Sequence, residues 1–203
     1  MLSRFRGLMT RLWTPLADAL LRAGVSPDAV TITGTLVVVV TALWAFPTGH
    51  LLLGGVLIAV FTLTDSIDGV MARRSGRSGP WGAFLDSTLD RFGDAAIFAG
   101  LVLWYTGAGD SRADAVLALV CLVLGSVVPY ARARAEGLGM TASVGIAERA
   151  DRLLAVLAAT ILVGAGLPGV VMTVVLALLA VASAVTVVQR MATVRRQARQ
   201  VTS

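Results

Sequence analysis

The chain has 203 residues, of which 57% are hydrophobic and only 14% are charged, and its mean hydropathy is +0.84. This composition excludes a soluble domain of ordinary type and indicates an integral membrane protein. The basic residues are all arginine and give a formal net charge of +5, which must lie outside the hydrocarbon or inside a polar cavity. We expect membrane lipid, and no nucleic acid, to be the partner of this charge.

The first predicted element is an amphipathic helix within residues 1–25 that lies on the membrane surface. Its apolar residues recur at three- and four-residue spacing, with arginines mostly on the other face. A secretory signal peptide is the alternative, but this segment lacks an uninterrupted apolar core and a small-residue cleavage site. Ser26, Pro27 and Asp28 then break the chain and offer a cap to the next helix.

Six apolar runs follow, each close to the length needed to cross a bilayer. The sequence therefore predicts an all-α integral membrane fold with six transmembrane helices after the interfacial helix. We expect one domain over residues 1–203, with the six-helix bundle between residues 28 and 192. The predicted spans are residues 29–46, 51–72, 82–105, 113–132, 149–167 and 169–189.

The arginines favour one side of this predicted bundle. The short turns 47–50, 106–112 and 166–169 contain Arg112 as their sole basic residue, whereas the opposite side and both termini carry most of the others. The positive-inside rule therefore predicts that both termini face the cytoplasm, in the cell membrane.

Four aspartates interrupt the second and third predicted spans near their cytoplasmic ends. Asp65 and Asp68 are three residues apart and Asp86 and Asp90 are four apart, so each pair lies on one helix face. The short loop between the spans makes them antiparallel neighbours, and the two pairs can converge. An ionised acid at the bilayer centre costs about 2.5 to 3.5 kcal/mol. The cluster thus indicates a water-filled cavity, bound divalent cations, or both, although capping and pairing with nearby arginines are alternatives.

The aspartates stand in a longer pattern, D-x2-D-G-x2-A-R-x8-G-x3-D-x3-D, which runs from Asp65 to Asp90. With this pattern and its six predicted spans, the chain resembles the CDP-alcohol phosphotransferase family over essentially its whole length. The resemblance implies an enzyme that displaces CMP from a CDP-linked lipid with the hydroxyl of a second alcohol. It also implies a homodimer.

The resemblance further implies roles for individual residues. Asp65, Asp68 and Asp86 would hold two divalent metals, Mg²⁺ or Mn²⁺, with Asp90 near the second metal and acting as general base. The metals would neutralise the pyrophosphate, and a carboxylate would take the proton of the attacking hydroxyl. For Asp28 and Thr31, plain helix capping is the alternative. The residues implied to contact CDP-diacylglycerol are Asp28, Ala29, Val30, Thr31, Gly69, Arg73 and Gly79.

The acceptor alcohol must be read from polar residues at the ends of the other spans, and these are mostly arginines. Forked, permanently charged donors suit a phosphate monoester better than a zwitterion, although such arginines also serve as membrane anchors. Residues 130–154 resemble the actinobacterial branch of the family that uses inositol phosphate. That resemblance implies that Arg132, Arg152 and Arg190 bind the acceptor phosphate.

Two alternatives stay open at this stage. The same chemistry with glycerol 3-phosphate as acceptor would make phosphatidylglycerophosphate, and it needs an anion pocket as well. A cation channel or transporter would also use intramembrane acids, but the acidic pairs occur once, and broken helices are missing from the other half.

Overall fold

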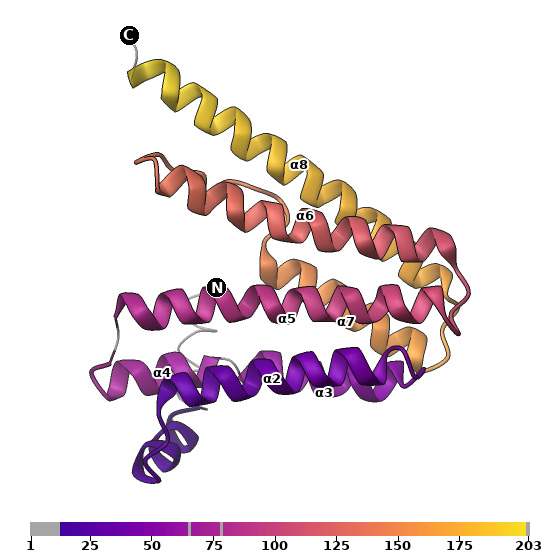
Figure 1. Cartoon of the computed structure of the whole chain (residues 1–203), viewed down its shortest axis with the longest axis horizontal. Coiled ribbons are helices and arrows are strands. Elements are labelled where there is room, and N and C mark those ends of the chain that lie inside the picture. The colour runs from indigo at the N-terminus through magenta and orange to yellow at the C-terminus, as the bar shows by residue number, and fades with distance from the viewer. Residues whose placement is uncertain (1–12, 65, 78, 202–203) are drawn as a thin grey trace.

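The computed structural model describes residues 13–64, 66–77 and 79–201, and this part of the chain is helical apart from short turns and the longer non-helical segment 137–148 (Figure 1). Residues 13–22 are helical, as expected for the end of the interfacial helix, whereas residues 1–12 lie outside the described residues. The remaining helices are α2 (Pro27–Ala45), α3 (Leu51–Thr64), α4 (Ser66–Arg74), α5 (Pro80–Thr106), α6 (Arg112–Glu136), α7 (Arg149–Gly164) and α8 (Val170–Val201).

The first residues of α2 explain where that helix begins. The Ser26 hydroxyl accepts a hydrogen bond from the backbone amide of Ala29 at 3.2 Å, and Pro27 occupies the first helical turn. The first amide groups of a helix have no partner within the helix. The Ser26 hydroxyl binds one of them, and Pro27 has no N–H that needs a partner. The predicted break at residues 26–28 is therefore confirmed as a cap, and its capping side chain is that of Ser26.

Several of these helices are long and apolar enough to cross a membrane. They are Pro27–Ala45, Arg112–Glu136 and Val170–Gln200, together with the stretch Leu51–Arg74, which comprises α3 and α4 with Asp65 between them outside the described residues. Helix α5 carries four charged residues, Asp86, Asp90, Arg91 and Asp94, and α7 has only 16 residues. The protein is thus a multi-pass membrane protein, and the count of six spans stays a prediction.

Helix α5 lies between α2 and α6, α6 also packs on α8, and α7 packs against α3 and α8 (Figure 1). Buried apolar side chains join these helices, among them Phe46, Ile97, Leu101 and Leu176. Large apolar residues on the outer faces, such as those at positions 40, 63, 178 and 181, are exposed. Apolar outer faces fit a lipid environment.

Helices α2 and α5 approach each other closely at Gly100. A Cβ atom at this position would lie 2.4 Å from the backbone oxygen of Ala42, a contact that only a backbone shift relieves. Small residues allow such close approach between helices in membranes. A Cβ at Gly93, on the same helix, would lie 3.7 Å from Val38, which is an ordinary contact.

We therefore expect Gly100→Ala to destabilise the protein by about 1 to 3 kcal/mol. Gly93→Ala is the matched control and should leave the stability unchanged or slightly raised, because alanine favours the helix. Thermal unfolding of both variants in one detergent measures the difference, and equal midpoints would contradict the close packing of α2 on α5.

Candidate active site

Asp68 lies in the first turn of α4, and Asp86 and Asp90 lie in α5; a short loop joins these two helices at the left of Figure 1. Asp65 lies outside the described residues. The half-buried Asp68 carboxylate accepts hydrogen bonds from the Thr31 hydroxyl of α2 and from the backbone amide of Gly69, the latter at 2.5 Å. These bonds fix the direction of the Asp68 side chain.

Asp86 faces the same region from α5. Its carboxylate repels that of Asp68 electrostatically, whereas the Arg73 guanidinium attracts Asp68. Asp68 and Asp86 are therefore within electrostatic range of each other, and the convergence of the acidic pairs stays a prediction. Within the described residues no group of three potential ligands is assembled closely enough to hold a metal, but Asp65 does not belong to that set. Carboxylates supply the hard oxygen ligands that Mg²⁺ and Mn²⁺ prefer, so the chemistry of Asp68 and Asp86 fits a divalent cation.

The residues predicted to contact CDP-diacylglycerol border this acidic region. Gly69 faces the Arg73 side chain, because a Cβ at Gly69 would lie 3.4 Å from the Arg73 Nη1 atom. Gly79 directly precedes α5. Asp28, Ala29, Val30 and Thr31 form the first turns of α2.

Asp28 and Thr31 make tertiary contacts. The Trp81 indole donates a hydrogen bond to the Asp28 carboxylate at 2.9 Å, which joins the starts of α2 and α5. Because Ser26 supplies the cap of α2 and Thr31 contacts Asp68, the plain capping alternative for Asp28 and Thr31 is not what the structure shows.

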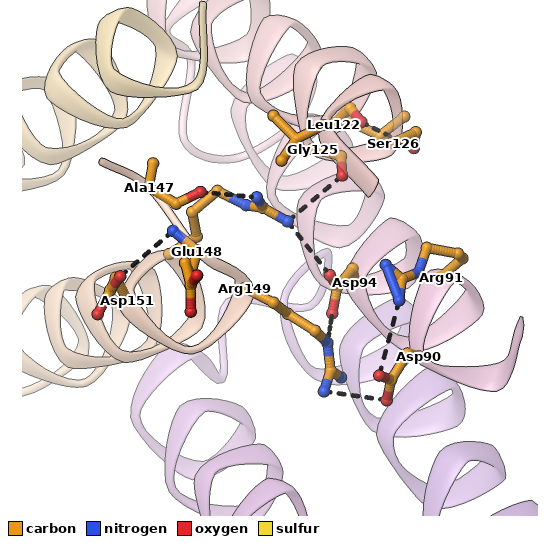
Figure 2. Close-up of polar contacts among 12 residues, drawn as sticks. Asp90, Arg91, Asp94, Leu122, Gly125, Ser126, Ala147, Glu148, Arg149 and Asp151 are labelled. Atoms are coloured by element: carbon orange, nitrogen blue, oxygen red, sulfur yellow. Dashed lines mark hydrogen bonds and ion pairs between the residues drawn. The ribbon is translucent and has the colours of Figure 1, made fainter. Parts of the chain in front are cut away.

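Asp90, the predicted base, lies one helical turn beyond Asp86, and its side chain is 16% exposed. Figure 2 shows its contacts: Arg149 of α7 lies 2.9 Å away and Arg91 lies 3.8 Å away. A spacing of three residues on α5 would favour an ion pair between Arg91 and Asp94, but the structure does not form it. Asp94 instead contacts Arg149 at 3.0 Å and Arg152 at 3.7 Å, because these long side chains reach α5 from the first turn of α7.

A cavity of about 630 Å³ opens beside Asp90 among α5, α6, α7 and α8. Its described lining is strongly cationic, and carboxylates of Glu136 and Glu148 also face it. The arginines that line it are Arg91, Arg132, Arg149, Arg152 and Arg190. The structure thus brings the three predicted acceptor-binding arginines into one cavity, although they are far apart in sequence.

Two of these arginines also donate hydrogen bonds to backbone carbonyls around the cavity. Arg152 is 3% exposed and donates to the carbonyls of Gly125 and Ala147 at 3.3 and 3.4 Å. Arg190 is 4% exposed and donates to the carbonyls of Val128 and Val144 at 2.6 and 2.9 Å. A guanidinium has five N–H groups, so each retains donors for a ligand. Arg132 is more exposed and pairs with Glu136 at 2.8 Å.

Sequence reasoning did not single out Arg149 and Arg91 as site residues. Arg91 lies next to the last signature aspartate, and Arg149 lies in a run of alternating charge, Glu148-Arg149-Ala150-Asp151-Arg152. The position of Arg91 beside Asp90 was a signal that could have found it. The contact of Arg149 with α5 depends on the packing of helices distant in sequence.

Comparison with known proteins assigns the chain to a protein family. The profile of the CDP-alcohol phosphatidyltransferase family matches residues 24–188. The chain belongs to this family and is a CDP-alcohol phosphotransferase.

The similar proteins include particular enzymes from actinobacteria. The chain is 49% identical to the phosphatidylinositol phosphate synthase of Cutibacterium acnes, over 97% of this chain and 98% of that protein. It is 46% identical to the synthase of the same name from Streptomyces avermitilis, over 97% of this chain and 84% of that protein.

Solved structures of the Mycobacterium tuberculosis phosphatidylinositol phosphate synthase share the fold. The one with CDP-DAG bound has a TM-score of 0.87 and 41% sequence identity, covering 91% of this chain and 94% of that chain. The one in complex with manganese and citrate has a TM-score of 0.86 and the same identity, covering 90% and 88%.

Proposed function

We propose that this enzyme transfers the phosphatidyl group of CDP-diacylglycerol to a hydroxyl of myo-inositol phosphate and releases CMP. The similar enzymes named phosphatidylinositol phosphate synthase support this acceptor. The observation that carries the proposal is the arginine-lined cavity beside Asp90, which suits a phosphorylated polyol.

In the proposed reaction, the acceptor oxygen forms a bond to the phosphorus that carries diacylglycerol, and the bond from that phosphorus to CMP breaks. Asp90 takes the proton of the attacking hydroxyl. Asp65, Asp68 and Asp86 hold two divalent cations, Mg²⁺ or Mn²⁺, with Asp90 beside the second, and the cations neutralise charge on the pyrophosphate and on departing CMP. The first turns of α2 together with Gly69, Arg73 and Gly79 hold the CDP group.

The acceptor phosphate lies, in this proposal, among Arg132, Arg152 and Arg190. Arg132 gives the cleanest test, because the other two also bind backbone carbonyls. We expect Arg132→Gln to raise the KM for inositol phosphate about tenfold, through loss of one charge-assisted hydrogen bond, and to change the KM for CDP-diacylglycerol little. Arg134→Gln, an exposed position on the same helix end, is the control. Steady-state CMP release measures both constants, and equal effects on the two substrates would contradict the assignment.

Glycerol 3-phosphate is the competing acceptor, since it also carries a phosphate monoester. The deciding experiment gives purified enzyme Mg²⁺ and CDP-diacylglycerol and then offers inositol phosphate, glycerol 3-phosphate, free inositol and serine separately. Mass spectrometry of the lipid product is expected to show phosphatidylinositol phosphate as the main product. Product from glycerol 3-phosphate alone would overturn the proposal.

We also propose a homodimer in the cell membrane, with the active site and both termini facing the cytoplasm. The positive-inside rule supports this orientation, because arginines gather at the end of the bundle that holds the site.

A further inference from the structure

Arg149 joins two carboxylates of α5 by different edges of one guanidinium. Its Nη1 atom lies 2.9 Å from Asp90 Oδ1, and its Nε atom lies 3.0 Å from Asp94 Oδ1 (Figure 2). Asp90 and Asp94 are one helical turn apart, so both carboxylates point to the same side of α5. Arg149 comes from α7 and lines the cationic cavity.

Both the carboxylate partner of Arg149 and the helix start that carries Arg149 are held by further contacts. Asp94 is buried, and its second oxygen lies 3.7 Å from Arg152, which donates to carbonyls of α6 and of the segment before α7. The Asp151 carboxylate accepts a hydrogen bond from the Glu148 amide at 3.2 Å and fixes the start of α7 (Figure 2). The guanidinium is therefore held before any substrate binds.

We propose that Arg149 is a positioning residue of the transfer reaction. Anchored on Asp94, it holds the Asp90 carboxylate at the edge of the acceptor cavity, aligned with the hydroxyl that attacks. The inference rests on the proposed function, in which Asp90 is the base. Asp94 contributes by directing Arg149, and neither residue needs to contact the lipid substrate.

The geometry requires arginine at this position. A guanidinium is planar and offers donors on two edges, whereas a lysine ammonium is a single charged point that cannot occupy both contacts in the same arrangement. A misplacement of a reacting group by about 1 Å can cost about 100-fold in rate. Loss of Arg149 should thus appear in kcat more than in the binding of either substrate.

The test compares Arg149→Ala, Arg149→Lys and Asp94→Asn with wild-type full-length enzyme. We expect Arg149→Ala to lower kcat roughly 100-fold, while the KM values and CDP-diacylglycerol binding change by no more than about twofold. Arg149→Lys should recover part of the lost rate, and added guanidinium ion should recover part in Arg149→Ala. Arg134→Ala is the control that should match wild type.

A double-variant cycle tests the link to Asp94. Because Asp94 acts through Arg149, the effects of Asp94→Asn and Arg149→Ala on kcat should be strongly non-additive. Additive effects would overturn the inference. A rise in the acceptor KM alone in Arg149→Ala would also overturn it, because Arg149 would then be a phosphate ligand. An unfolded Arg149→Ala variant that does not respond to guanidinium ion would overturn it too, because Arg149 would then be purely structural.

The proposed function is tested separately, by the acceptor preference of the wild-type enzyme. If wild-type enzyme prefers another acceptor, the kinetics are run with that acceptor, and the positioning role is still judged by the split between kcat and KM.

Discussion

Asp90→Asn is expected to lower kcat by about 10²- to 10⁴-fold, the usual contribution of a general base. An amide cannot accept the proton of the attacking hydroxyl, although it has nearly the shape of the carboxylate. The variant should remain folded and should still bind CDP-diacylglycerol. Single-turnover release of CMP, measured alongside CDP-diacylglycerol binding, separates the chemical step from substrate binding.

Asp110→Asn is a suitable control for this experiment. Asp110 lies in the turn at the opposite end of α5, with a positive φ of 39° that asparagine also tolerates. Wild-type turnover is expected in the control. If Asp90→Asn kept more than about a tenth of wild-type turnover, Asp90 could not be the base.

Asp68→Asn and Asp86→Asn should each bring turnover close to background, because each removes a charge from the proposed ligand set. We expect the affinity for Mn²⁺ to fall more than about 100-fold, beyond the loss seen when only an outer partner of a ligand is removed. Titration with Mn²⁺, followed by electron paramagnetic resonance, measures binding without relying on activity.

High Mn²⁺ concentration should restore part of the activity of Asp68→Asn, since mass action offsets a weaker site. Asp18→Asn is a comparison outside the acidic cluster, where the lost carboxylate pairs with Arg74 at 2.6 Å. Unchanged Mn²⁺ affinity in Asp68→Asn and Asp86→Asn would show that these carboxylates do not bind the metal.

Much of the fold was predictable because apolar run length and helix-breaking residues are local signals. The starts of α2, α6 and α7 agree closely with the predicted spans, and the turn residues fall between them. The second predicted span corresponds to α3 and α4, between which Asp65 lies outside the described residues. Helix α7 ends at Gly164, three residues before the predicted end of its span.

The acidic half of the site was also predictable, since spacings of three and four residues place side chains on one face of a helix. The electrostatic interaction between Asp68 and Asp86 agrees with that spacing and with the short loop. The contacts of Asp94 were not predictable in this way. Its partners Arg149 and Arg152 are more than 50 residues away, and a local i to i+3 rule wrongly favoured Arg91.

The burial of Arg152 and Arg190 could not be inferred from sequence either. Arginines at span ends are mostly solvated anchors, and only helix packing shows that these two bind backbone carbonyls around a cavity. Their charge correctly indicated an anion pocket, but the sequence did not indicate their second role, which is to bind backbone carbonyls. Variants of either residue therefore need a stability measurement beside the kinetics.

The most direct test of the active-site assignment is anomalous scattering from crystals grown with Mn²⁺ and CDP-diacylglycerol. We expect two manganese peaks between α4 and α5, in contact with carboxylate oxygens of Asp68 and Asp86, and with the pyrophosphate beside them. Absence of manganese from these carboxylates while the nucleotide is bound would contradict the assignment of this cluster as the metal centre.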